Sequence, residues 1–143
     1  VFRSIYQVED NRVIASSAKQ VKVILITDKE KAQQHEAEIG EIDFDILRVF
    51  SIKKLRAAMD EYPSHLVLAD CDSVLDIANM VSTVRDFDQR SETESYAPII
   101  GIGKLENNVE SSIYELGLDD FVNLGIVSDK TLASTVKYWS TLT

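Results

Sequence analysis

The sequence predicts a doubly wound α/β domain over residues 21–143, in which a parallel β-sheet carries helices on both faces. Two observations lead to this fold class. Short apolar runs alternate with amphipathic stretches from residue 21 onward, which is the pattern of repeated βα units. The chain has 143 residues, of which 45% are hydrophobic and 27% are charged. That length and composition fit one domain with a substantial core.

Five apolar segments are the expected strands. Each is short, and Pro98 is tolerable because it lies near the start of its segment. The segment 65–69 is the most continuously apolar, so we expect it near the centre of the sheet. The five expected strands are 21–26, 44–50, 65–69, 97–102 and 121–124.

Five further stretches are the expected helices. The first, 29–39, is polar enough to be well exposed, and Asp28 can cap it through its side-chain oxygen. A second helix lies between Ser51 and Pro63, where apolar residues recur at helical spacing. The others are a helix over 74–88, a fourth marked by Val109, Ile113 and Leu116 and ended by Gly117, and a last one over 129–141. Five strands alternating with five helices, (βα)5, give the flavodoxin-like strand order 2-1-3-4-5.

Residues 1–20 are expected to form an N-terminal extension or linker, separate from the domain over 21–143. Two short runs, VFRSIYQ and RVIAS, flank Glu9, Asp10 and Asn11. This arrangement suits a hairpin, a linker, or the tail strand of a preceding domain. The chain begins at Val1 rather than Met, so we expect it to be a piece of something longer.

Charge and composition narrow the class of protein. The net charge is -9, which argues against a nucleic-acid binder because such proteins need clustered Lys and Arg. No apolar run of about 18 residues is present, so we expect no membrane-spanning segment. The single cysteine, Cys71, excludes an internal disulfide and favours a reducing, cytoplasmic location.

Candidate site residues gather where strands end. Ligands of open parallel sheets bind at the carboxyl ends of the strands, beside the switch in strand order. Two carboxylates, Asp28 and Asp70, are expected to point into this crevice. An aspartate there can accept a phosphoryl group if a cation offsets its charge, and two carboxylates with waters could hold magnesium weakly. The residues at these ends are Thr27, Asp28, Asp70, Gly103, Lys104 and Leu124.

At these positions the chain resembles the receiver domain of two-component response regulators. The segment HLVLAD is similar to the family's third strand, which ends in the phosphoaccepting aspartate, so the resemblance gives that role to Asp70. The segments APIIGIG and YELGLDDFVNLG resemble the fourth strand and the region leading through the fifth strand. The resemblance covers residues 21–143.

Several departures from the family pattern imply a degenerate receiver. The resemblance puts Thr27 and Asp28 at the paired acidic positions for magnesium, so one carboxylate is lost. At the position where the family has a hydroxyl residue that contacts the phosphoryl group, this chain has Gly103. At the position of the family's lysine in the fifth strand, it has Leu124. The switch aromatic falls on Phe121, which has no hydroxyl. We interpret the chain as a pseudo-receiver.

The function implied is a non-catalytic signalling module of a two-component system, part of a larger sensor kinase or regulator. It is expected to act through contacts with a histidine kinase or neighbouring domains, and through a homodimer over the helix 4–strand 5–helix 5 face. No cofactor is expected, except magnesium if Asp70 is phosphorylated. Two alternatives stay open. Asp70 could be a working phosphoacceptor that borrows a lysine such as Lys104, or the crevice could sense a nucleotide second messenger.

Other residues receive ordinary interpretations. His35 and His65 have no cysteine or third histidine nearby, so we expect surface or edge positions rather than a metal site. Lys53, Lys54 and Arg56 form a small basic patch on the second expected helix. The patch is interpreted as a solvated face, with docking to an acidic partner as the alternative.

Overall fold

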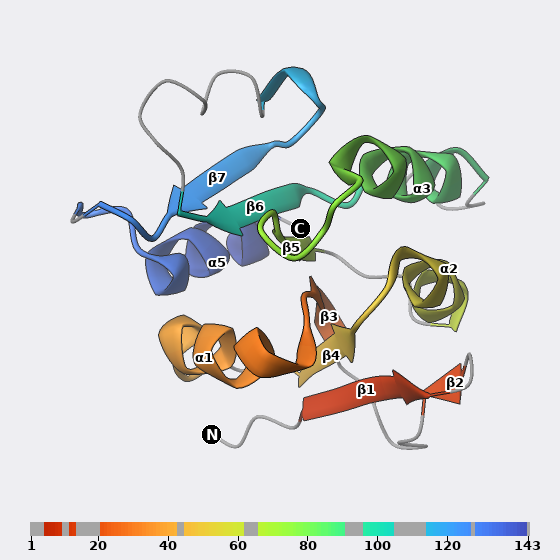
Figure 1. Ribbon diagram of the computed structural model, residues 1–143, viewed down its shortest axis with the longest axis horizontal. Coiled ribbons are helices and arrows are strands. Elements are labelled where there is room, and N and C mark those ends of the chain that lie inside the picture. Colours follow the sequence, from red (N-terminus) through yellow and green to blue (C-terminus); the bar gives the residue numbers. More distant parts are fainter. Residues whose placement is uncertain are drawn as a thin grey trace.

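The computed structural model describes residues 5–9, 12–13, 21–42, 45–61, 66–90, 96–104, 114–126 and 128–142 (Figure 1). Within these ranges one sheet contains seven strands in the order β2-β1-β4-β3-β5-β6-β7. The strands are β1 (Ile5–Glu9), β2 (Arg12–Val13), β3 (Val21–Ile26), β4 (Asp45–Val49), β5 (Leu66–Asp70), β6 (Ile99–Gly103) and β7 (Asp120–Asn123).

The five strands from residue 21 onward confirm the predicted topology. Their order is β4-β3-β5-β6-β7, which is 2-1-3-4-5 when counted from Val21. All four pairings are parallel. Strand β5, within the segment expected near the centre, is the middle one of these five. Strand β3 is also paired on both sides, since Ile24 lies opposite Leu47 of β4 and Val67 of β5. The strand order reverses at β3, which makes its carboxyl end the switch point of the sheet.

Two N-terminal strands extend this sheet at the β4 edge. Strand β1 runs parallel to β4, with Ile5 opposite Ile46, and β2 pairs antiparallel to β1, with Val8 opposite Val13. These pairings agree with the hairpin interpretation of residues 1–20. The division of the chain at residue 20 stays a prediction.

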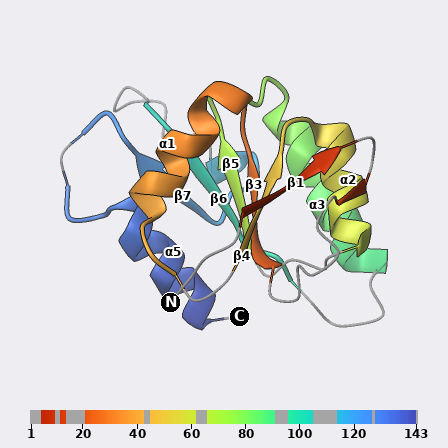
Figure 2. The ribbon, with the colours of Figure 1, turned by 90° about the horizontal axis from the view of Figure 1, so that it is seen from below.

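Helices cover both faces of the sheet, as Figure 2 shows. Helices α1 (Lys29–Ile39) and α5 (Leu132–Thr141) lie on one face, and α2 (Ile52–Glu61) and α3 (Ile77–Arg90) lie on the other. Alternate residues of β3 serve the two faces: Ile24 and Ile26 belong to the core under α2 and α3, and Val23 and Leu25 belong to the core under α1 and α5. This alternation follows from the period of two in a strand.

Helices α3 and α5 begin a few residues later than predicted from the sequence, because capping side chains set their first turns. Helix α3 begins at Ile77 rather than Val74, because Oδ1 of Asp76 accepts a hydrogen bond from the backbone N–H of Asn79 at 2.9 Å. Helix α5 begins at Leu132 because Thr131 and Ser134 form a capping box.

The fourth expected helix falls mainly on positions outside the described ranges, including Val109 and Ile113, as do Pro63 and His65. Gly117, which was expected to end that helix, is described. It has φ = 104°, a left-handed conformation that glycine adopts most readily.

One expectation about α1 is wrong. The helix was expected to be well exposed, yet it buries Ala32, His35, Glu36 and Ile39. These residues recur at intervals of three and four, so they share one face of the helix. Glu36 is accommodated there because it pairs with the guanidinium group of Arg48 on β4. The polar composition of α1 therefore conceals a buried stripe.

Candidate functional site

The predicted site residues Thr27, Asp28 and Asp70 come together at the carboxyl ends of β3 and β5. Ile26 of β3 lies opposite Ala69 of β5 in the parallel register, so the residues that follow each strand are neighbours. Thr27 directly follows β3, and Asp70 is the last residue of β5. Asp70 is only 1% exposed. The sheet thus buries the Asp70 carboxylate at the carboxyl end of β5, next to the strand where the strand order reverses.

Both carboxylate oxygens of Asp70 have hydrogen-bond partners. Oδ1 accepts from the backbone N–H groups of Asp72 at 2.9 Å and Ser73 at 3.2 Å. Oδ2 accepts from the hydroxyl group of Thr27 at 3.2 Å and lies 2.6 Å from Nε2 of His35. The ammonium group of Lys31 is 3.9 Å from the same oxygen. The oxygen that faces α1 is therefore the more crowded of the two.

His35 was expected at the surface, and that expectation is wrong. Its residue exposure is 4%, because α1 turns this face toward the sheet. A carboxylate only accepts hydrogen bonds, so Nε2 carries the proton that it donates to Asp70. Within the part of the chain that the structure describes, Nδ1 of His35 is buried and has no hydrogen-bond partner. The ring is thus held through one nitrogen, and that nitrogen is committed to Asp70.

The environment of Asp70 favours its ionised form. Burial by itself would raise the pKa of the Asp70 carboxyl group, but the hydrogen bond and charge of His35, the charge of Lys31 and the N–H of Asp72 act in the opposite direction. The net pKa lies below the ordinary value. Asp70 is therefore a buried carboxylate that the protein neutralises from α1.

Asp28 serves mainly as a local structural residue. Its Oδ1 accepts from the backbone N–H of Lys31 at 2.9 Å, which caps α1, and its Oδ2 accepts from the hydroxyl group of Ser73 at 2.6 Å. These hydrogen bonds, Ser73 first, lower the pKa of the Asp28 carboxyl group. The predicted cap is confirmed, and a link between α1 and the loop after β5 is added.

The oxygens of Asp28 and Asp70 are directed at protein donors and cations. Magnesium requires several oxygen ligands around it, whereas Oδ2 of Asp70 faces His35 and the ammonium group of Lys31. Asp28 already accepts hydrogen bonds on both oxygens. Among the described residues, no cluster of three or more His, Cys, Asp or Glu residues could hold a metal ion.

On the other half of the edge, formed by β6 and β7, no charged side chain among the described residues pairs with Asp70. Gly103 ends β6, and a Cβ atom there would meet nothing nearer than 3.5 Å. Leu124 packs against the apolar core on the α1–α5 face. Phe121 is buried and comes close to Gly101, where a Cβ atom would lie 2.7 Å from its ring. The position expected for a switch aromatic therefore holds a ring packed into the core.

The lysine that lies beside Asp70 was not singled out from the sequence. Lys104 was the suggested substitute for the missing lysine, but within the described ranges it makes no ion pair; its backbone N–H donates to Asp72 at 3.3 Å. The ammonium group beside Asp70 belongs to Lys31. The available signal was the spacing of Lys31 and His35, four residues apart and so on one helix face directly after the capping Asp28.

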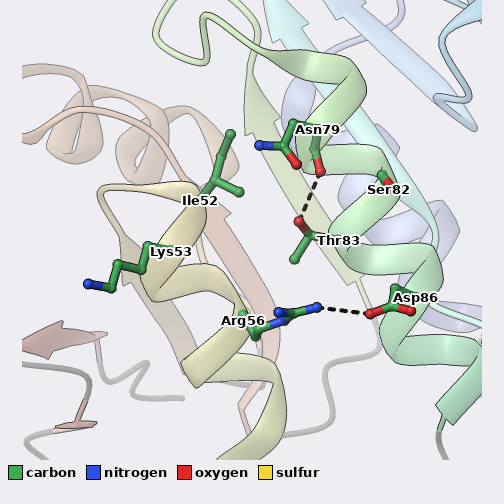
Figure 3. Close-up of a pocket in the computed structure, with 7 residues that line it drawn as sticks. All are labelled: Ile52, Lys53, Arg56, Asn79, Ser82, Thr83 and Asp86. Atoms are coloured by element: carbon green, nitrogen blue, oxygen red, sulfur yellow. Dashed lines mark hydrogen bonds and ion pairs between the residues drawn. The ribbon is translucent and has the colours of Figure 1, made fainter.

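One surface hollow borders the candidate site, and a larger groove lies between two helices. One of about 250 Å³ opens at the carboxyl ends of β3 and β4 and is lined in part by Thr27 and Ser73. A larger groove of about 450 Å³ runs between α2 and α3 (Figure 3). Arg56 and Asp86 form an ion pair at 2.9 Å across that groove. Asp70 lines neither hollow.

The thiol of Cys71 follows Asp70 directly. Burial, the largest influence, raises its pKa to about 12. The thiol is therefore protonated at neutral pH.

No helix in the described part of the chain combines the length and apolar character needed to cross a membrane.

No family model and no curated protein matches the chain. Two solved structures have similar folds. A probable two-component system response regulator/GGDEF domain protein matches with a TM-score of 0.64 and 20% identity, over 87% of this chain and 51% of that protein. The N-terminal domain of the nisin resistance regulator NsrR, a lantibiotic response regulator, matches with a TM-score of 0.56 and 13% identity, over 86% of this chain and 97% of that one.

These likenesses confirm the receiver-like fold. The chain spans about half the length of the response regulator/GGDEF protein that it matches, namely 51%.

Proposed function

We propose that the chain is a pseudo-receiver: a signalling module of a two-component system that works through protein contacts and does not accept a phosphoryl group on Asp70. One observation carries this proposal. The carboxylate of Asp70 is 1% exposed, and its Oδ2 lies 2.6 Å from Nε2 of His35.

A phosphoacceptor must offer a free oxygen to the incoming phosphorus atom. Oδ1 of Asp70 accepts two backbone hydrogen bonds, and Oδ2 contacts Thr27 and His35. Attack through Oδ2 would require His35 to leave its buried position. Attack through Oδ1 would require the loop after β5 to release its N–H groups. Either change breaks buried hydrogen bonds, and each such loss costs about 1–3 kcal/mol.

Charge balance also disfavours the phosphorylated state. A phosphoryl group brings about two negative charges, and the loop that follows Asp70 already carries the carboxylate of Asp72 and contacts that of Asp28 through Ser73. Lys31 supplies one ammonium group at 3.9 Å. The positions where the family pattern places a hydroxyl group and a lysine hold Gly103 and Leu124. Accordingly, we propose no enzymatic activity and no magnesium requirement.

The module is proposed to lie in the cytoplasm, within a larger sensor kinase or regulator. The match to half of a response regulator/GGDEF protein supports the multidomain setting. Candidate contact surfaces include the β7–α5 side, where the Tyr138 ring is exposed. A histidine kinase or a neighbouring domain of the same chain would be the partner there.

The test is the intact mass of the protein after incubation with acetyl phosphate and magnesium, beside a functional receiver as a positive control. We expect no phosphoryl adduct on the wild-type chain. An adduct that forms on the wild type and disappears in Asp70→Asn would overturn the proposal and support the phosphoacceptor alternative.

A further inference from the structure

Leu75 is the most exposed large apolar residue that the structure describes. It lies in the loop between β5 and α3 and is 99% exposed. The same loop borders the hollow of about 250 Å³ at the ends of β3 and β4. Leu75 lies at its rim, and the other apolar lining residues are Ile26, Phe50, Ile52 and Val74. An apolar projection and an apolar hollow are therefore adjacent on one surface.

The polar groups around this hollow are already engaged within the chain. The hydroxyl group of Thr27 donates to Asp70, and the hydroxyl group of Ser73 donates to Asp28. The carboxylate of Asp76 caps α3. The hollow therefore offers mainly apolar surface to an occupant, and an aliphatic side chain suits it better than a polar ligand.

We propose that the occupant is Leu75 of a second copy of this chain, so that two copies form a two-fold symmetric dimer. A symmetric interface uses the same patch on both copies and must be self-complementary. This patch meets that requirement because each copy supplies one projection and one hollow. The sizes agree: a cavity of about 150 Å³ holds a benzene ring, so about 250 Å³ has room for a leucine side chain.

The charges around the patch are arranged in the same complementary way. Asp76 follows Leu75 directly, is exposed, and lines the hollow. Ile52 lines the hollow from the other side, and Lys53 follows it at the start of α2 and extends away from α3 (Figure 3). Among the described residues, no carboxylate pairs with Lys53, whereas Arg56 pairs with Asp86. A two-fold axis near Leu75 brings the acidic loop of one copy to the basic, N-terminal end of α2 in the other.

This inference deepens the proposed function, since it names one partner for a module that acts through contacts, and it rests on that proposal. The two fail separately. A phosphoryl adduct on Asp70 would remove the pseudo-receiver assignment whether or not a dimer forms. A chain that takes no adduct and stays monomeric would remove the dimer alone.

The test is sedimentation equilibrium of the 143-residue chain over a range of concentrations. We expect reversible dimerisation. In Leu75→Ser the dissociation constant should rise by about 100-fold, because each dimer loses two buried leucine side chains. Thermal unfolding should be unchanged in this variant, since Leu75 is 99% exposed in the monomer. Leu142→Ser, which alters an exposed leucine at the end of α5, is the matched control and should dimerise as the wild type does.

Charge exchange gives a second, independent test. Lys53→Glu should weaken the dimer about tenfold through repulsion from Asp76. The double variant Lys53→Glu/Asp76→Asn, in which Asn can still cap α3, should recover part of the loss. A chain that stays monomeric at about 1 mM, where even a weak dimer is partly formed, overturns the proposal. A dimer that is indifferent to Leu75→Ser overturns it equally.

Discussion

The two halves of the sheet's carboxyl edge differ in how far they depart from the receiver pattern. On the β3–β5 half, Asp28 and Asp70 are present, and α1 adds His35 and Lys31 around Asp70. On the β6–β7 half, Gly103, Leu124 and Phe121 contribute small or apolar surface. On the first half, the carboxylate of Asp70 is paired with His35 and Lys31. On the second half, Phe121 and Leu124 pack into the cores.

On the β3–β5 half, both acidic residues link neighbouring elements. Asp70 connects β5, the following loop, Thr27 and α1 through hydrogen bonds. Asp28 connects α1 to the loop at Ser73. Both therefore have structural partners that would be lost on substitution. On the described part of the β6–β7 half, Asn123 and Asp72 accept single backbone hydrogen bonds from Gly125 and Lys104, and Leu124 and Phe121 pack into the two cores.

The largest expected effect is from His35→Ala. This change leaves the Asp70 carboxylate buried without its closest partner, and breaking a buried pair in this way costs about 3 kcal/mol. Urea unfolding followed by circular dichroism measures the loss. Gln34→Ala, on the exposed side of the same helix, is the control and should change stability by less than about 0.5 kcal/mol. An equally small loss in His35→Ala would mean that the β3–β5 half is not organised around this pair.

A smaller effect is expected at the glycines of β6, and it distinguishes two positions on the same strand. In Gly101→Ala the new Cβ atom would lie 2.7 Å from the Phe121 ring and 2.8 Å from Leu118, so overpacking should cost about 2 kcal/mol. In Gly103→Ala the nearest atoms are 3.5 Å away, and the cost should be below about 0.5 kcal/mol. Thermal unfolding of the two variants, measured side by side, tests the contrast. Equal losses would contradict the close packing assigned to Phe121.

The smallest effect is expected in the pH dependence of stability. Because the pKa of Asp70 is lowered in the folded protein, the unfolded state binds more protons as the carboxyl groups begin to titrate. The contribution of Asp70 is therefore complete above its unfolded pKa of about 3.9. It is lost as pH falls through the lower folded value.

The check is the free energy of unfolding between neutral pH and about pH 3, for the wild type and Asp70→Asn. The variant should be less stable at neutral pH and should lose less stability on acidification. Some pH dependence should persist in it, because the pKa of Asp120 is also lowered: hydrogen bonds from Lys130 and Trp139 outweigh the effect of its burial. Parallel curves for the two proteins would contradict the assignment.

The strands of the sheet could be predicted from the sequence because short stretches of neighbouring residues identify them. Apolar runs such as VKVILI and LVLA identify buried strands, and the alternation with helices determines the order β4-β3-β5-β6-β7. The pairing of β1 with β4 was not predicted. It joins residues about forty positions apart, such as Ile5 and Ile46, and no local pattern encodes it.

The candidate site was predictable in part for the same reason. Thr27, Asp28 and Asp70 follow from the positions where strands end. His35 was missed because α1 is polar throughout, so composition favoured an exposed helix over a buried stripe. The burial of His35 and Glu36 depends on partners in other elements, Asp70 and Arg48. Only the folded arrangement brings those partners together.

The most direct test of the central claim is a titration of the ¹⁵N-labelled chain with magnesium and beryllofluoride, a phosphoryl mimic, followed by amide NMR. The account predicts no saturable shifts in the loop after Asp70 or at Thr27. Saturable shifts around Asp70 that vanish in Asp70→Asn would contradict it, because they would show that the carboxylate can leave His35 and accept a phosphoryl-like group.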